Sequence, residues 1–287
     1  MPAEPVLPPR WLVRFGYDGS GFAGWARQPG QRTVEGEIHQ GLVRAKIAPS
    51  ADAGRPRVAS RTDRGVHARG NALAISSRLD GPALLRALNG IAPDVFFTHA
   101  RSVPEAFAAR GAASRWYRYF EPSAGRDLGR WREAAELFRG DIDVRSFGRS
   151  VDPARPVWRT VDRVEVHGHG DCLVVDVRAP SFVWGMVRKI VAALRGYDSG
   201  RFALGTLRAA TEGHRRCAVP MAEPERLVLW EVDYPGAWEV EAVGLAGHQR
   251  RAARRAQEAT SARRAVVSGL WASAPGGLPA TPVGRRL

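Results

Sequence analysis

The segment "VASRTDRGVHARGNA", residues 58–72, places one carboxylate, Asp63, among several cationic side chains. Arg61 and Arg64 lie within two positions of it. Opposite charge close to a carboxyl group favours the ionised form, which suits a nucleophile or a general base better than a general acid. The pattern also fits a turn, because an Asp with Gly two residues later often binds nearby backbone N–H groups through its side chain. From these residues alone, both interpretations remain open.

A second cation, Arg188, interrupts an otherwise amphipathic segment. The sequence "SFVWGMVRKIVAALRG", residues 181–196, predicts a helix with Ser181 as its N-cap and Gly196 at its end. Arg188 lies beside the apolar stripe of this helix, and a buried arginine there would need an acidic partner, for which the distant Asp63 would serve. The alternative is an arginine whose stem packs at the edge of the stripe while its head group reaches solvent.

The segment "RWYRYF", residues 115–120, alternates aromatic and arginine side chains. Trp116, Tyr117 and Tyr119 could stack on nucleobases while the arginines contact phosphate groups. Aromatic strands are also common in protein cores, so a purely structural strand is the alternative.

Histidine and cysteine residues give little indication of a metal site or of disulfides. His167 and His169 could ligate a metal ion, but no third ligand lies nearby in the sequence, so a polar hairpin turn is favoured. Cys172 and Cys217 form no CxxC pair, which is typical of a reducing compartment. No apolar run approaches the roughly 20 residues of a membrane span, and the N-terminus lacks a signal-peptide pattern. We therefore expect a soluble, cytoplasmic protein with no membrane partner.

The whole chain is strongly basic. It has 287 residues and a formal net charge of +14, which indicates a polyanionic partner such as nucleic acid. Only Lys46 and Lys189 are lysines, so 41 of the 43 basic residues are arginines. This bias can also reflect the nucleotide composition of the gene, so the charge alone does not establish nucleic-acid binding.

The elements that must position these residues form two similar series. The first series has a strand at 11–19, a helix at 33–47, strands at 56–60 and 70–77, a helix between Asp80 and Pro93, and a strand at 95–103. Thr33 and Asp80 are the predicted N-caps. This β-α-β-β-α-β order matches the split βαβ plan of ferredoxin-like and RRM-like domains.

The second series repeats this order. It has a strand at 115–120, a helix at 131–140, a hairpin at 157–179, helices at 181–196 and near 202–213, and a strand at 226–234. We expect an α+β protein with an extended lead at 1–10, an N-terminal domain at 11–106 that carries the Asp63 loop, a C-terminal domain at 107–237, and a basic tail at 238–287, partly helical or disordered.

These motifs together resemble one enzyme family. The segment "SRTDRGVHA", residues 60–68, is similar to the G-R-T-D-x-G-V-H-A signature of the TruA-type tRNA pseudouridine synthases. "RWYRYF" resembles the R-x-Y-x-Y strand of that family, and "SFVWGMVRKI" resembles its F-L-x-x-M-V-R-x-I helix. "YDGSGFAGWARQP" and "LVLWEVDYP" also have counterparts, so the resemblance spans about residues 11–236 and leaves out the basic tail.

The resemblance implies a reaction and a role for each candidate residue. The enzyme would break the N1–C1′ bond of a uridine, turn the uracil over and rejoin it through C5, without a cofactor or a metal ion. Asp63 would be the attacking acid, and Arg188 would pair with it. Arg61 would contact phosphate or fill the space that the flipped base leaves. Tyr117 would stack on the uracil and help to move the C5 proton.

The resemblance also implies a fold, a substrate and an assembly. The fold would join the two similar halves in one long mixed sheet, with helices packed on it and the active-site cleft between the halves. The substrate would be uridines at positions 38–40 in the anticodon arm of tRNA, and the enzyme would be a homodimer.

Some positions depart from the family pattern. Ser60 stands where many relatives have Gly, and Arg64 stands where some have Ala. Trp184 and Gly185 occupy places that are often His-His or Trp-Gln. These departures affect the expected substrate range more than the expected activity.

Two other classes of protein fit the charge. A non-catalytic RNA-binding or RNA-folding protein on the same scaffold is the main alternative, but such a protein would have no reason to keep Asp63, Tyr117 and Arg188 together. A basic DNA-binding protein is a weaker alternative, because the sequence has no helix-turn-helix or zinc pattern.

Overall fold

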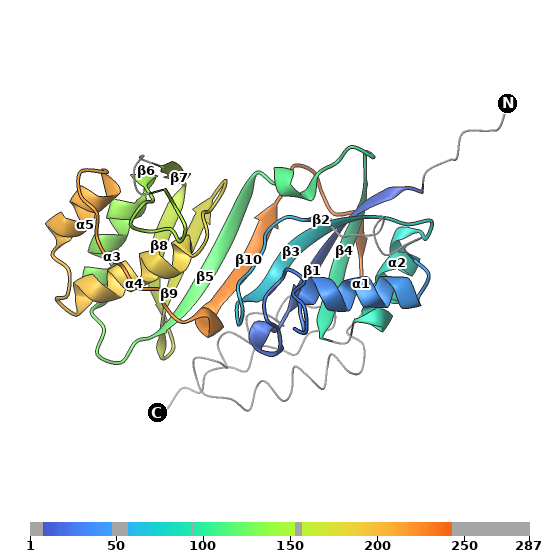
Figure 1. Cartoon of the computed structure of the whole chain (residues 1–287), viewed down its shortest axis with the longest axis horizontal. Coiled ribbons are helices and arrows are strands. Elements are labelled where there is room, and N and C mark those ends of the chain that lie inside the picture. Colours follow the sequence, from blue (N-terminus) through green and yellow to red (C-terminus); the bar gives the residue numbers. More distant parts are fainter. Residues whose placement is uncertain (1–7, 48–56, 93, 153–156, 243–287) are drawn as a thin grey trace. The chain divides into compact units, whose positions relative to one another are not determined.

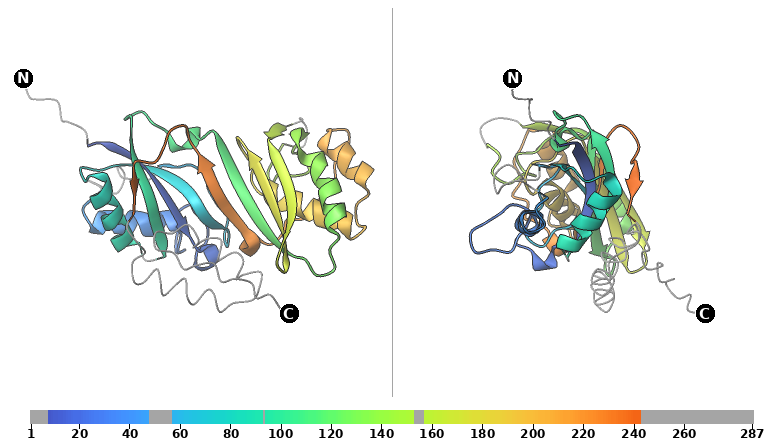
Figure 2. Two further views of the ribbon diagram at one scale, coloured as in Figure 1. Left: turned by 180° about the vertical axis from the view of Figure 1, so that it is seen from behind. Right: turned by 90° about the vertical axis from the view of Figure 1, so that its right-hand side faces the viewer.

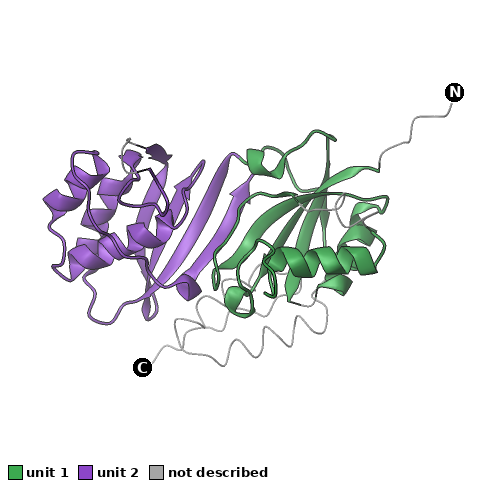
Figure 3. Cartoon of the chain, viewed as in Figure 1, with its two compact units in different colours: residues 1–112, 234–258, 267–280 green, residues 113–233, 259–266, 281–287 purple. Residues whose placement is uncertain are grey.

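The computed structural model describes residues 8–47, 57–92, 94–152 and 157–242 (Figure 1). They divide into two compact units (Figure 3). Unit 1 contains the described residues up to Ala112 and again from Tyr234, and unit 2 runs from Ala113 to Asp233. In this part of the chain, none of the helices has the length and apolar character needed to cross a bilayer.

Unit 1 is a sheet with two helices. Its elements are β1 (Arg10–Tyr17), α1 (Val34–Arg44), β2 (Arg57–Val58), β3 (His67–Ser76), α2 (Gly81–Ile91), β4 (Val95–Val103) and the short β11 (Val240–Glu241). The strands pair antiparallel in the order β11-β4-β1-β3, and β2 pairs with β3. Because β1 has a neighbour on each side, Leu12, Val13 and Phe15 are fully buried there, which explains the apolar run in the sequence.

Both helices of unit 1 begin at their predicted caps. The Thr33 hydroxyl accepts a hydrogen bond from the Gly36 amide at 3.2 Å, and the Asp80 carboxylate accepts one from the Ala83 amide at 2.8 Å. Helix α1 lies on one face of the sheet: it is in front of the strands in Figure 1 and behind them in the view from the back in Figure 2. Helix α2 contacts both α1 and β4.

Unit 2 repeats the plan with additions. Its elements are β5 (Ser114–Pro122), α3 (Leu128–Ala135), β6 (Gly140–Asp143), β7 (Trp158–Val161), β8 (Arg163–His169), β9 (Cys172–Ala179), α4 (Met186–Asp198), α5 (Leu204–Thr211) and β10 (Leu227–Asp233). The strands β10-β5-β9-β8 pair antiparallel in that order, and β6 pairs with β7 in a separate two-stranded sheet. Helix α3 contacts both β8 and α4.

The two units share one strand order. Counted within its own β-α-β-β-α-β series, each sheet runs fourth, first, third, second: β4-β1-β3-β2 in unit 1 and β10-β5-β9-β8 in unit 2. This is the split βαβ arrangement expected from the order of elements. The predicted α+β class with two similar halves is therefore confirmed.

Three predicted elements in unit 2 have different bounds. The helix predicted from Ser181 begins at Met186, because Gly185 precedes it with a φ of +76°, outside the helical region. Helix α3 begins at Leu128, earlier than predicted, because Asp127 caps it by accepting from the Gly129 and Arg130 amides. The predicted strand at 157–166 is two strands, β7 and β8, that pair with different partners.

The predicted basic tail begins differently from the expectation. Residues 238–242 run along β4 instead of starting a helix: β11 pairs with β4, and the Trp238 ring lies 5.9 Å from the His99 ring. The rest of the predicted tail, residues 243–287, lies outside the described residues.

Candidate active site

Asp63 lies on the loop that joins β2 to β3. Its backbone carbonyl accepts a hydrogen bond from the Val66 amide at 3.2 Å, which closes a tight turn. Gly65 occupies the third position of this turn with a φ of +79°, as a type II turn requires. The turn that the sequence suggested is therefore present, and it leaves the Asp63 side chain partly exposed. Arg61, two residues earlier, is exposed.

The segment after β1 holds this loop. The hydroxyls of Tyr17 and Thr62 are 2.7 Å apart in a buried hydrogen bond, and the Trp25 amide donates to the Thr62 carbonyl at 3.0 Å. Gly24 has a φ of +103°, and a Cβ there would lie about 3.0–3.2 Å from the Thr62–Arg64 backbone. Only glycine fits this close approach without strain. The residue before Asp63 is therefore held through both its side chain and its backbone.

A second contact fixes the end of the loop. His67 Nδ1 lies 3.1 Å from an Asp18 carboxylate oxygen and 3.2 Å from the Gly19 amide nitrogen. Burial would raise the pKa of Asp18, but hydrogen bonds from His67 and Ser20 hold it well below its ordinary value. One ring nitrogen cannot donate to the carboxylate and accept from the amide at once. Either contact ties His67 to the Asp18–Gly19 segment.

The start of the loop is fixed by Asn71, which is fully buried in β3. Its amide nitrogen donates to the Ser60 carbonyl at 2.9 Å, and its amide oxygen accepts from the Ala72 backbone at 2.9 Å. Farther out, Arg64 donates to the side-chain oxygen of Gln31 at 3.2 Å. The loop is therefore fixed at its start, beside Asp63 and at its end. This explains why the motifs at 17–29 and 60–68 belong together.

Tyr117 lies in the middle strand pair of unit 2. It is on β5, in register with Val177 of β9 and Leu229 of β10. Its side chain is 7% exposed, and the Phe182 ring packs edge-on against it at 5.1 Å and 83°. The sheet and Phe182 therefore fix the orientation of the phenol.

Arg188 lies in the first turn of α4. Its Nε donates to the Ala222 carbonyl at 2.7 Å, and the Ala222 amide donates back to the Arg188 carbonyl at 3.2 Å. The guanidinium is therefore anchored to the segment that carries Ala222. Asp63 belongs to unit 1, whereas Tyr117 and Arg188 belong to unit 2. The predicted pairing of Arg188 with Asp63 stays a prediction.

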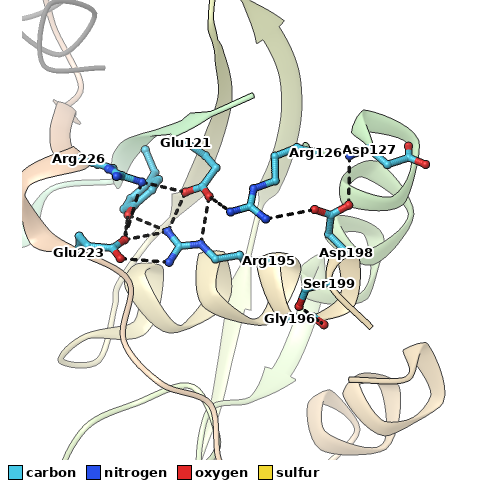
Figure 4. Close-up of polar contacts among 10 residues, drawn as sticks. Glu121, Arg126, Asp127, Arg195, Gly196, Asp198, Ser199, Glu223 and Arg226 are labelled. Carbon is cyan, nitrogen blue, oxygen red and sulfur yellow. Dashed lines mark hydrogen bonds and ion pairs between the residues drawn. The ribbon is translucent and has the colours of Figure 1, made fainter. Parts of the chain in front are cut away.

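A buried ion cluster ties the strand of Tyr117 to the helix of Arg188 (Figure 4). Glu121 on β5 is fully buried and accepts from Arg195 of α4 at 2.7 and 3.1 Å. Arg195 also donates to Glu223 at 2.8 Å, and the Tyr119 hydroxyl donates to the same Glu223 oxygen at 3.0 Å. Glu223 directly follows the residue that binds Arg188. The cluster therefore connects three segments around the two candidate residues.

The charges of this cluster are strongly coupled. The hydrogen bond from Arg195 lowers the pKa of Glu223 to about 2. Burial and the carboxylate of Glu223 raise the pKa of the Tyr119 phenol above its ordinary value, so the phenol stays protonated and donates. Sequence reasoning missed this cluster. The one local signal was a glutamate, Glu121, at the end of an aromatic strand.

Of the other two aromatic residues of the stacking hypothesis, Tyr119 is too buried to stack on a base, whereas Trp116 is partly exposed and its stacking stays a prediction. Tyr119 is fully buried. Trp116 donates through Nε1 to Asp176 at 2.7 Å, and Arg118 makes two hydrogen bonds of 2.8 Å to the same carboxylate. Arg118 also lies 4.1 Å over the Trp230 ring. These side chains contact one another within unit 2, as in the core-strand alternative.

His167 and His169 lie in the hairpin formed by β8 and β9, as predicted. Within the described ranges, no group of three or more His, Cys, Asp or Glu residues has the geometry to hold a metal ion.

Comparisons with known proteins identify the family. A family model described as tRNA pseudouridine synthase matches residues 134–235. The chain is 40% identical over 226 residues to tRNA pseudouridine synthase A of Thermococcus kodakarensis, covering 78% of this chain and 84% of the relative. It is 39% identical over 230 residues to the protein of the same name from Pyrococcus abyssi, covering 79% of this chain and 85% of that relative. The corresponding protein of Pyrococcus furiosus is 37% identical over 247 residues, covering 84% and 90%.

The family model includes the Arg188 helix, and the relatives match most of both chains. The protein therefore belongs to the tRNA pseudouridine synthases, isomerases that convert uridine to pseudouridine.

Proposed function

We propose that this enzyme isomerises uridines at positions 38–40 in the anticodon arm of tRNA and that Asp63 is its catalytic carboxylate. The observation that carries the second part is the loop geometry. Thr62, directly before Asp63, is held through its hydroxyl by Tyr17 and through its carbonyl by Trp25. A catalytic group must be held within a fraction of an ångström of its productive position, and such a loop meets that need.

The chemistry requires a charged carboxylate and access to an extruded base. The N1–C1′ bond of the uridine breaks, the uracil turns over, and a new bond forms between C5 and C1′, while C5 loses a proton and N1 gains one. The target base must leave its stack to reach the catalytic carboxylate. Asp63 would act either on the sugar carbon or on a sugar proton. In both cases it must be ionised at neutral pH.

Tyr117 and the two arginines have supporting roles in this proposal. The Tyr117 ring, held by Phe182, would stack on the uracil, and its phenol would help to move the C5 proton. Arg188, anchored through Nε to Ala222, would pair with Asp63. Arg61 is exposed, as a phosphate contact or a substitute for the extruded base requires.

The charge of the chain fits a tRNA partner. A net charge of +14 attracts the phosphate backbone and makes binding salt-dependent. The cytoplasmic location and the homodimer implied by the family resemblance belong to the same proposal. Light scattering of the purified protein tests the dimer.

The decisive experiment uses an unmodified tRNA transcript with a uridine at each of positions 38–40. We expect the wild type to form pseudouridine at these positions, detected by chemical mapping, and Asp63→Asn to form none while binding the transcript with unchanged affinity. Asp94→Asn is the matched control, because Asp94 is an exposed acid of the same unit paired with Arg32. It should keep full activity.

Each failure has a distinct meaning. Turnover by Asp63→Asn would remove Asp63 from its role. Pseudouridine at other positions only would overturn the site assignment but not the chemistry. Binding by the wild type without any product would favour the non-catalytic alternative.

A further inference from the structure

Two indole side chains stand out on the surface of unit 2. Among the described residues, the large apolar side chains classed as exposed are Val43, Leu79, Trp158 and Trp184. Trp184 is 50% exposed and Trp158 is 48% exposed. A half-exposed tryptophan loses much of the stabilisation that burial would give, so its place needs another explanation.

The backbone holds Trp184 firmly although its ring is half exposed. The Arg149 amide donates to the Trp184 carbonyl at 2.7 Å. Gly185 follows with a φ of +76°, and a Cβ there would lie 2.8 Å from the Met221 sulfur. The Arg149 guanidinium carbon lies 4.3 Å from the centre of the indole ring, in a cation–π contact. Trp184 is therefore ordered before any ligand binds.

Trp184 also lies next to two candidate residues of the proposed site. Phe182, two positions earlier, packs against the Tyr117 ring at 5.1 Å. Arg188, four positions later, lies in the first turn of α4. The segment that orients Tyr117 and leads to Arg188 is thus the segment that presents the exposed indole.

Cationic side chains lie on this segment and beside it: Arg149 packs on the indole, and Lys189 belongs to the first turn of α4. Lys189 donates to the Ser146 carbonyl at 3.2 Å, and the Ser146 hydroxyl accepts from the Cys217 amide at 2.9 Å. Burial and the charge of Arg216 lower the pKa of Lys189, as expected where cations gather. Arg216 itself is exposed. Aromatic rings among arginines and lysines are typical of single-stranded RNA recognition, whereas lysine is depleted in protein interfaces.

We propose that Trp184, backed by Arg149, is a stacking platform for an unpaired nucleobase that neighbours the target uridine in the RNA. This inference rests on the proposed function and deepens it, because it assigns a binding role to Trp184. The guanidinium of Arg149 lies against the ring and can also reach the phosphate of the stacked nucleotide.

The test compares two tryptophans of equal exposure. Fluorescence anisotropy with a labelled anticodon stem-loop gives the Kd of the wild type, Trp184→Ala, Trp184→Phe and Trp158→Ala. Stacking of one base on an aromatic ring corresponds to a Kd change of about 5- to 150-fold on alanine substitution. We expect a rise in this range for Trp184→Ala, a much smaller one for Trp184→Phe, and less than about twofold for Trp158→Ala.

A second arm identifies the stacked base. Stem-loops with one abasic nucleotide at each loop position are titrated against the wild type and Trp184→Ala. The platform predicts one position at which base removal weakens wild-type binding but leaves the Kd of Trp184→Ala unchanged. Arg149→Ala, which keeps the indole, should raise the Kd by a smaller factor. It provides an independent variant if Trp184→Ala does not fold, as judged by circular dichroism.

The outcomes separate this inference from the proposed function. Pseudouridine formation by the wild type is measured on the same RNA, and its absence counts against the proposed function. If the wild type is active, equal Kd values for Trp184→Ala and Trp158→Ala overturn the platform alone. Unchanged RNA binding by Trp184→Ala would likewise reject it and favour a protein partner for this indole.

Discussion

The carboxylate of Glu121 accepts two hydrogen bonds from the guanidinium of Arg195, at 2.7 and 3.1 Å, in the interior of unit 2 (Figure 4). Arg126 adds an ion pair to the same carboxylate at 3.0 Å, and Arg226 lies 3.6 Å from it. Glu121 is fully buried. Breaking a buried pair by removing one charge is costly, because the remaining charges lose their partner in a medium that solvates them poorly.

Glu121→Gln should lower the free energy of unfolding by about 1–3 kcal/mol, since the buried acceptor loses its charge, whereas the partly exposed Arg195 and Arg126 keep Glu223 and Asp198 as partners. Urea unfolding measures this loss. Glu136→Gln is the control, because Glu136 pairs with Arg139 on the surface and such pairs contribute less than about 1 kcal/mol. Similar small losses for the two variants would mean that the buried cluster adds no stability.

Glu223 should make stability depend on pH. Its pKa falls from an ordinary 4.5 to about 2 in the folded protein. The ionised Glu223 therefore contributes fully to the free energy of unfolding above about pH 4.5, and this contribution is lost as the pH falls towards 2. The Tm difference between the wild type and Glu223→Gln should be constant near neutral pH and shrink below about pH 4.5. A difference that stays constant down to pH 3 would contradict this, because all other carboxylates are common to both proteins.

The hydrogen bond between Tyr17 and Thr62 should couple the stability of the Asp63 loop to its function. Each of Tyr17→Phe and Thr62→Val leaves a buried hydroxyl without this partner, which costs about 1–3 kcal/mol. The double variant should lose less than the sum of the two. All three should lower kcat on tRNA more than they raise KM, because Asp63 loses its fixed position. Additive losses, or unchanged kcat, would show that the contact does not hold the loop.

Local signals in the sequence predicted much of the fold. The caps at Thr33 and Asp80 follow from contacts three residues away, and the strand at Val95–Val103 from a continuous β-rich run. The predicted start of α4 at Ser181 was wrong, because Gly185 has a positive φ and the helix begins after it. The neighbours of this turn, Arg149 and Met221, are distant in the sequence. Helices and strands that depend on neighbouring residues can therefore be predicted from the sequence. Boundaries that depend on tertiary contacts cannot.

The candidate site divides in the same way. From its neighbours alone, Asp63 fitted both a turn and a catalytic acid, and the family resemblance favoured catalysis. The partners that hold the loop, such as Gly24 and Tyr17, are some 40 residues away, so nothing beside Asp63 indicates them. The Glu121 cluster joins residues that are far apart in the sequence, such as Tyr119 and Glu223 at 104 positions, and sequence reasoning missed it.

Tyr117→Phe should separate stacking from proton transfer. The ring and its edge-on contact with Phe182 remain, so folding and tRNA affinity should stay within about twofold of the wild type. Loss of the phenol should lower kcat by about 10²-fold or more if it takes part in proton transfer. Single-turnover pseudouridine formation at saturating enzyme measures this step. An unchanged rate would reduce Tyr117 to a stacking surface.

Deletion of residues 243–287 should weaken the binding of tRNA without affecting the chemical step. This segment contains eight arginines and one glutamate, and the cut leaves β11 in place on β4. Fewer cations near the RNA reduce the number of counterions released, so the slope of log K against log salt should become less steep.

A full-length variant with these arginines changed to glutamine separates charge from length and should behave like the deletion. At saturating tRNA, both should form pseudouridine at the wild-type rate. An unchanged salt slope would mean that the tail does not contact the RNA, and a loss of folding on deletion would mean that it stabilises the enzyme.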